Sequence, residues 1–159
     1  MGLNKAIEKI TVPAPAKINL FLAITGRRPD DYHQIQSVIS KIDLADYVTL
    51  EKTDKLDEVT CVCTGNHSLS GEQNLACSAV REWRQVTGDR TGIKVAIQKN
   101  IPIMAGLGGG SSDAVSTLLG LNYLNGNLLR DSELSNIAQR LGSDCAFFLT
   151  NGLAHVTGR

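Results

Sequence analysis

Apolar and polar residues alternate along residues 12–24, a pattern typical of a strand with one buried face. One face carries four aliphatic side chains: Ile18, Leu20, Leu22 and Ile24. The opposite face carries a mixed set: Lys17, Asn19, Phe21 and Ala23. The pattern therefore predicts a half-buried strand on which the polar groups of Lys17 and Asn19 are neighbours.

Further segments also have strand character. They are residues 36–41, 47–52, 59–63 and 93–97, with a last strand that begins at Leu153. Residues 27–31 are predicted to form a charged turn after the first strand. A second turn, at residues 43–46, is predicted to separate the next two strands.

Three segments have the spacing of amphipathic or buried helices. Asn74 opens the first, which runs through Gln85, and the second runs from Ser112 to about Leu124 with little polar surface. The third covers residues 131–140, with Ser132 as a candidate cap and Gly142 as its natural end. Because strands cluster early and helices come later, the pattern predicts an α+β fold, a mixed or antiparallel sheet packed with helices.

The composition excludes several classes of function. The 159 residues carry 16 basic and 16 acidic side chains, so no overall field attracts nucleic acid or an anionic membrane. The longest apolar runs, such as residues 145–149, are too short to span a bilayer. The charged N-terminal segment lacks the apolar core of a signal peptide. We therefore expect a soluble, cytoplasmic protein.

The four cysteines are interpreted as small apolar residues in a reducing compartment. Cys61 and Cys63 fall on one face of a predicted strand, and Cys77 and Cys145 lie far along the chain. The pair has no matching second pair with the spacing of a zinc site.

A glycine-rich segment precedes the second helix. Four of the five residues 106–110 are glycine, and Ser111 and Ser112 follow. Such a backbone can lie close to a ligand, and the unpaired N–H groups of a helix start favour an anion. No lysine follows Lys99, which excludes a Walker A loop, and Ser111 interrupts the dinucleotide fingerprint. The segment predicts a phosphate site; the alternative is a glycine-rich surface turn.

Other candidate residues are individually ordinary. Lys17 alone would be an exposed strand lysine, and Asp144 alone a local cap or turn former. Tyr32 and His33 would be an exposed loop pair. None of these residues identifies a site without the others.

Taken together, four segments closely resemble the GHMP kinases: residues 14–22 (Ala-Pro-Ala-Lys-Ile-Asn-Leu-Phe-Leu), 30–33 (Asp-Asp-Tyr-His), 106–112 and 141–144 (Leu-Gly-Ser-Asp). The resemblance covers nearly the whole chain in order. It implies that residues 1–159 form a GHMP kinase N-terminal, ATP-binding domain, ribosomal S5 domain 2-like. Members of the family continue into a second α/β domain, which we expect to be absent from this chain and needed to complete the site.

The first and second segments resemble the branch of the family with a CDP-linked substrate. The resemblance implies ATP-dependent phosphorylation of the 2-hydroxyl of a CDP-linked methylerythritol, in the methylerythritol phosphate route to isoprenoids. Asp144 would accept the hydroxyl proton, and Lys17 would meet Asp144, keep it ionised and offset developing charge. Asn19 would contact the substrate near Lys17, and Tyr32 and His33 would grip the cytidine.

The resemblance also assigns the nucleotide site. Asn74 would lie near the adenosine part of ATP. The phosphates would be held by one run of residues: Pro102, Ile103, Met104, Ala105, Gly106, Leu107, Gly108, Gly109, Gly110, Ser111 and Ser112. Mg²⁺ is expected with ATP, with its ligands unassigned. Many relatives have Asn at position 113; Asp113 is interpreted as a plain acid of the first helical turn rather than a Mg²⁺ ligand.

Three alternatives stay open. One is another small-molecule GHMP kinase, for homoserine or mevalonate, which would lack the cytidine grip. A second is a non-catalytic module of the same fold that binds RNA, which the zero net charge disfavours. A third is a truncated fragment that binds nucleotide without turnover. The expected partners are small-molecule substrates, with no nucleic acid and no membrane.

Overall fold

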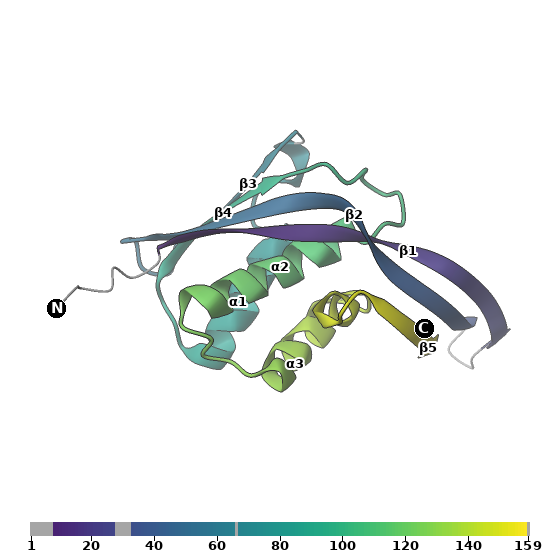
Figure 1. Ribbon diagram of the computed structural model, residues 1–159. Coiled ribbons are helices and arrows are strands. Elements are labelled where there is room, and N and C mark those ends of the chain that lie inside the picture. The colour runs from purple at the N-terminus through teal and green to yellow at the C-terminus, as the bar shows by residue number, and fades with distance from the viewer. Residues whose placement is uncertain (1–7, 28–32, 66, 159) are drawn as a thin grey trace.

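A five-stranded mixed sheet forms one layer of the protein (Figure 1). The computed structural model describes residues 8–27, 33–65 and 67–158. Strands β1 (Lys9–Arg27) and β2 (His33–Thr53) form a long antiparallel pair. Strand β4 (Gly92–Gln98) is antiparallel to β2, and β3 (Val59–Thr64) is parallel to β4. The order is β1-β2-β4-β3, with β5 (Leu153–Gly158) pairing with the other end of β2. The α+β prediction is confirmed.

The predicted turn at residues 43–46 is wrong, because β2 is one continuous strand through it. Residues 35–40 of β2 pair with β5, and residues 47–53 pair with β4. Strand β1 pairs on both sides of this stretch, at Lys17↔Lys41 and Pro15↔Ala45, and the register shifts between these pairs, so residues 42–44 have no partner in β1. The turn-like composition of these residues therefore coincides with a bulge in a continuous strand and not with a break in it.

Helices α1 (Leu75–Thr87) and α2 (Gly109–Leu124) cover one face of the sheet, and α3 (Asp131–Leu141) packs against both of them (Figure 1). Helix α2 is buried along most of its length, as predicted. At Gly120 a Cβ would lie 2.6 Å from Leu50 Cδ1 and 3.2 Å from Val12 Cγ2. Gly120 therefore allows α2 to pack closely against β1 and β2, and this contact anchors the segment that precedes the helix.

The helix ends explain two differences from the sequence prediction. Helix α2 begins at Gly109, earlier than Ser112, because Gly108 adopts a left-handed conformation and serves as its N-cap. Helix α3 is not capped by Ser132. The backbone N–H of Arg130 donates to the Glu133 carboxylate at 2.9 Å, so Glu133 satisfies the helix start instead. The predicted end at Gly142 is confirmed.

The outer arm of β1, residues 20–24, extends beyond the helices (Figure 1). Leu20, Phe21, Leu22 and Ile24 are 54–65% exposed. The prediction of one buried face is therefore wrong for this half of the strand. The register shifts between Asn19 and Phe21, and the helical layer covers only the inner half of β1, which contains the buried Ala14 and Ala16. The outer arm leaves a contiguous run of apolar side chains uncovered.

Candidate active site

The glycine-rich loop and the start of α2 form one wall of a cavity of about 480 Å³. Gly106 and Gly108 have φ values of 73° and 70°. The first helical bond of α2 runs from the Ser112 N–H to the Gly108 carbonyl. The N–H groups of Gly109, Gly110 and Ser111 are therefore not used within the helix. The glycine-rich segment therefore ends in a helix N-terminus, three residues earlier than predicted, and this end suits an anion.

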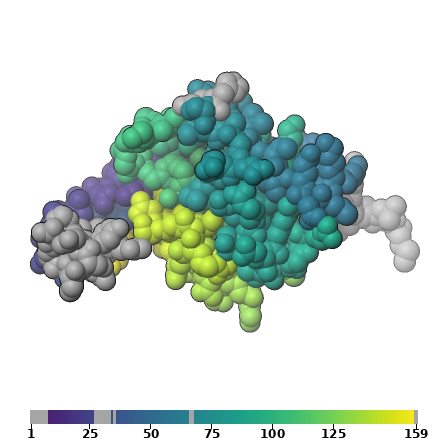
Figure 2. All heavy atoms as spheres, turned by 180° about the vertical axis from the view of Figure 1, so that it is seen from behind, coloured from purple at the N-terminus to yellow at the C-terminus, as the bar shows by residue number. Residues whose placement is uncertain are grey.

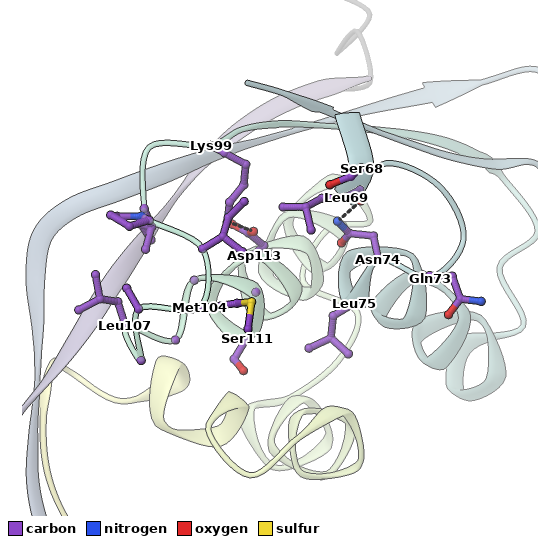
Figure 3. A pocket seen from close by; sticks show the side chains of 18 of the residues that line it. Ser68, Leu69, Gln73, Asn74, Leu75, Lys99, Met104, Leu107, Ser111 and Asp113 are labelled. Atoms are coloured by element: carbon purple, nitrogen blue, oxygen red, sulfur yellow. Dashed lines mark hydrogen bonds and ion pairs between the residues drawn. The ribbon is translucent and has the colours of Figure 1, made fainter. Parts of the chain in front are cut away.

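The opposite wall of this cavity comes from the start of α1 and the segment before it. Figure 3 shows Leu69 and Asn74 across the cavity from the loop residues Met104 and Ser111, and Ser68, Gln73 and Leu75 line the same wall. A cavity of this size, with apolar walls and backbone donors at one end, can hold a nucleotide.

Asn74 lies in this wall and is the N-cap of α1, as predicted for the residue that opens this helix. Its Oδ1 accepts from the Ala76 N–H at 2.8 Å and caps α1, and its Nδ2 donates to the Leu69 carbonyl at 2.9 Å. Contact of Asn74 with adenosine stays a prediction.

Lys17 and Asp144 meet in space, as predicted. Lys17 Nζ lies 3.4 Å from Asp144 Oδ2, and their side chains are 11% and 43% exposed. The Lys17 ammonium also donates to Asn19 Oδ1 at 3.1 Å, and Asn19 Nδ2 donates to Ser37 Oγ at 2.7 Å. Ser37 in turn donates to the Phe21 carbonyl at 2.7 Å. This chain of bonds fixes the direction of the Lys17 side chain.

A second cavity, of about 320 Å³, opens beside this ion pair. Lys17, Asn19, Ser37, Ser143 and Asp144 line it, together with apolar side chains of β2, β5 and the 3₁₀ helix Cys145–Leu149. The partly exposed Asp144 carboxylate can therefore reach a polar group bound in this cavity.

The two cavities adjoin at Lys17. The Lys17 backbone N–H donates to the Leu107 carbonyl at 2.9 Å, and a Cβ at Gly108 would lie 3.0 Å from Lys17 Cγ. Figure 2 shows the loop in green, β1 in purple and the C-terminal segment in yellow meeting on one face. A phosphate at the loop would thus lie beside the group that faces the second cavity, the arrangement that transfer between two ligands requires.

Sequence reasoning missed a buried charge cluster beneath the loop. Lys99 Nζ donates to Asp46 Oδ2 at 2.5 Å and to Asp113 Oδ2 at 2.7 Å. The side chains of Lys99, Asp46 and Asp113 are 9%, 0% and 3% exposed. The interpretation of Asp113 as a plain helix-start acid is wrong, because α2 begins four residues earlier and buries this carboxylate. The lack of a polar stripe around α2 was the available signal.

The cluster has perturbed proton affinities. Burial raises the pKa of Asp113 to about 7, and the nearby Asp46 adds to this increase while Lys99 opposes it. Burial alone would lower the pKa of Lys99. The hydrogen bonds and charges of Asp113 and Asp46 outweigh burial, so the pKa of Lys99 is raised. Lys99 therefore stays charged near neutral pH, whereas Asp113 exchanges a proton there.

Met104 has a strained backbone in the loop. Its φ is 58°, a left-handed conformation, and the residue is 99% exposed. Met104→Gly should stabilise the fold by up to about 1 kcal/mol, because removal of a left-handed penalty of about 1–2 kcal/mol outweighs the roughly 0.5–1 kcal/mol that glycine costs through the freedom of the unfolded chain. Urea unfolding measures this change. Ile103→Gly is the matched control and should destabilise, because Ile103 has no positive φ to relieve and glycine adds freedom to the unfolded chain. Equal destabilisation by both variants would contradict this account.

The structure does not describe the side chains of two predicted substrate residues, Tyr32 and His33. Tyr32 is outside the described residues. His33 begins β2, where its backbone pairs with Arg27, and its side chain is not described. Binding of cytidine by Tyr32 and His33 stays a prediction.

All four cysteines are buried with free thiols, as expected of small apolar residues. In the described ranges, no three His, Cys, Asp or Glu side chains are grouped as metal ligands. Over the same ranges, no helix is long and apolar enough to cross a membrane.

Comparison with known proteins places this architecture in a family. A family model described as "GHMP kinases N terminal domain" matches residues 74–152, which include α1, the glycine-rich loop, α2, α3 and Asp144. The chain carries a GHMP kinase N-terminal domain. Within this family the resemblance extends across both cavities, because similar proteins align with 92–96% of the chain.

Two curated relatives illustrate the GHMP kinase match. A protein of Polaromonas naphthalenivorans named 4-diphosphocytidyl-2-C-methyl-D-erythritol kinase is 44% identical over 92% of this chain and 51% of its own length. One of the same name from Geobacter metallireducens is 40% identical over 96% of this chain and 54% of its own length. The chain therefore spans about half the length of the curated relatives it matches.

Solved structures agree with the fold. A crystal structure titled 4-(cytidine 5'-diphospho)-2C-methyl-D-erythritol kinase superposes with a TM-score of 0.79 at 34% identity, over 94% of this chain and 52% of that one. A mevalonate kinase superposes with a TM-score of 0.73 at 18% identity, over 93% and 54%. The second match shows the GHMP kinase fold alone.

Proposed function

We propose that the protein phosphorylates the 2-hydroxyl of 4-diphosphocytidyl-2-C-methyl-D-erythritol with ATP, in the methylerythritol phosphate route to isoprenoids. The observation that carries the proposal is the Lys17–Asp144 pair, which lies between a cavity with a phosphate-type loop and a second, smaller cavity. The names of the relatives at 40–44% identity support this substrate.

Asp144 has the position of a proton acceptor in this proposal. Its carboxylate, partly exposed and 3.4 Å from the Lys17 ammonium, orients the attacking hydroxyl and takes its proton. Lys17 stabilises the ionised carboxylate and offsets the negative charge that develops on the transferred group. Asn19, bonded to Lys17, faces the substrate cavity and can contact the alcohol.

The loop supplies the ATP side. The N–H groups at the start of α2 bind the phosphates, and the walls that contain Asn74 and residues 102–105 enclose the nucleoside. Phosphoryl transfer depends mainly on alignment and electrostatic stabilisation, which these fixed donors provide.

Among the described residues, no three His, Cys, Asp or Glu side chains are grouped so that they could bind Mg²⁺. The residues that bind Mg²⁺ therefore stay unassigned. Mg²⁺ is proposed to arrive bound to the phosphates of ATP, where it neutralises their charge.

The remaining half of the relatives' length has a proposed role in completing the site. The outer arm exposes four apolar side chains next to the second cavity. An exposed apolar patch of this kind is typical of a surface that packs against another domain or protein. We propose that a C-terminal domain packs near this arm and closes the alcohol cavity. Small molecules remain the only partners proposed, with neither nucleic acid nor membrane, and the buried free thiols favour the cytoplasm.

Tyr32 and His33 provide a test of the cytidine part of the substrate. The double variant Tyr32→Ala/His33→Ala should raise the KM for the CDP-linked alcohol by about 10- to 100-fold, since base stacking on aromatic residues is worth about 1–3 kcal/mol in nucleic-acid sites. The KM for ATP should change far less. Steady-state kinetics of the intact protein, with each substrate varied in turn, measures both constants. Equal effects on the two constants would remove the support for cytidine recognition.

Another small-molecule GHMP kinase activity remains the second candidate, because mevalonate and homoserine kinases share the fold. Turnover of the intact protein with the CDP-linked alcohol, homoserine and mevalonate separates these candidates. The proposal expects product from the first substrate alone. Binding of ATP without product from any of them would indicate a nucleotide-binding protein without turnover.

A further inference from the structure

The buried cluster beneath the loop has an unbalanced charge. It contains one ammonium, from Lys99, and two carboxylates, from Asp46 and Asp113. Asp46 is fully satisfied, since its Oδ1 accepts the backbone N–H groups of Asn100 and Ile101 and its Oδ2 accepts from Lys99. If all three groups are ionised, the cluster carries one net negative charge in a largely buried environment that solvates it poorly.

Asp113 holds the charge that is not balanced. Its Oδ2 accepts from Lys99, but its Oδ1 is buried and has no hydrogen-bond partner among the described residues. The titratable groups that face it are Lys99 at the end of β4, Asp46 on β2 and Cys63 on β3. Lys99 is the only cation among these three groups, and Asp46 shares it.

The cluster lies directly beneath the proposed phosphate position. A Cβ at Gly109, the first residue of α2, would lie 3.3 Å from Lys99 Nζ. Asp113 and Lys99 both line the nucleotide cavity, as Figure 3 shows. Phosphates bound at this helix start would add like charge on the open side of a cluster that is already negative. Repulsion favours removal of the negative charge on Asp113 when the phosphates bind.

We propose that Asp113 takes up one proton when a nucleotide binds at the loop. The proton comes from solvent and bonds to the free Oδ1, and Lys99 and Asp46 remain as a balanced pair. Asp113 is then a positioning residue, because it acts through Lys99 and the loop rather than on the reacting atoms. This inference rests on the proposed ATP site.

The sign of the resulting pH dependence follows from linkage. A proton taken up on binding means that nucleotide affinity falls as pH rises. The pKa of Asp113 is raised to about 7 in the free protein, so uptake is expected to be nearly complete at pH 8. The dissociation constant should increase by up to about tenfold per pH unit above neutrality, with one proton linked.

Calorimetry of the intact protein with Mg²⁺ and ATP at pH 8, in two buffers of different ionisation enthalpy, counts the protons taken up. The wild type should take up about one proton more than Asp113→Asn, because the amide cannot accept the proton. Proton exchange by ATP itself is the same for both proteins and cancels in this difference. Asp131→Asn is the matched control: Asp131 is an exposed acid at the start of α3, and its loss should leave proton uptake unchanged.

If Asp113→Asn fails to fold, a ¹³C NMR titration of the Asp113 carboxyl group in the wild type replaces the variant. It measures the pKa of Asp113 with and without the nucleotide. The pKa of Asp113 should increase on binding. Equal proton uptake by wild type and Asp113→Asn, or an unchanged pKa of Asp113, would overturn the inference. A second titration with ATP alone separates the role of the cation: uptake of the extra proton with ATP alone but not with Mg²⁺ and ATP would overturn the inference too, because the cation would then balance the added charge. Absence of ATP binding at every pH would instead refute the proposed function.

Discussion

Asp144→Asn in the intact protein should reduce turnover by about 10²- to 10⁴-fold, the contribution that a positioned general base makes. The amide keeps the shape of the side chain but cannot accept the hydroxyl proton. ATP affinity should change little, because Asp144 lines the alcohol cavity and not the nucleotide cavity. Steady-state kinetics and ATP calorimetry measure the two effects separately.

Asp43→Asn is the matched control for this experiment. Asp43 is an exposed acid on β2 and lines neither cavity, so its loss should leave turnover unchanged. Turnover retained by Asp144→Asn would defeat the proposed role of Asp144. A parallel loss of ATP affinity would indicate that the variant disturbs the loop.

Gly108→Val should weaken ATP binding and should reduce turnover by on the order of 10²-fold, the loss in rate expected when a reacting group is misplaced by about 1 Å. Gly108 has a φ of 70°, and a Cβ there would lie 2.9 Å from Phe148 Cζ and 3.0 Å from Lys17 Cγ. A β-branched residue must therefore shift the loop, the start of α2, or Lys17. Turnover should fall further than affinity, because Lys17 also belongs to the Lys17–Asp144 pair.

Two controls separate strain from obstruction in this experiment. Gly126 has a similar φ of 71°, but a Cβ there would have no atom within 4 Å, so Gly126→Val tests backbone strain away from the site. Gly109→Val tests the milder contact at 3.2 Å from Ile101 Cγ2 and should weaken ATP binding less than Gly108→Val. Wild-type ATP affinity in Gly108→Val would mean that the loop is merely a turn.

The sequence predicts the local elements well and the long-range ones poorly. The helix that Asn74 caps and the strands at residues 59–63 and 93–97 follow from periodicity and capping, which are local properties. The continuity of β2 depends on pairing with β1, a contact between distant segments. Turn-like residues at 43–46 therefore misled the local analysis.

The site shows the same division. The glycine-rich loop was evident from its own residues, whereas the contact of Lys17 with Asp144 was predicted through the resemblance to a family. Lys99, Asp46 and Asp113 come from the end of β4, β2 and α2, and no local pattern connects them. A buried charge cluster becomes visible only when the fold brings its members together.

The most direct test of the central claim is transfer of the γ-phosphate of ATP to 4-diphosphocytidyl-2-C-methyl-D-erythritol by the intact protein, followed by ³¹P NMR. The account predicts a new phosphomonoester on the 2-hydroxyl that forms as ADP appears, and its loss in Asp144→Asn. ADP formation without this ester, or the same ester formed at wild-type rate by Asp144→Asn, would contradict the account.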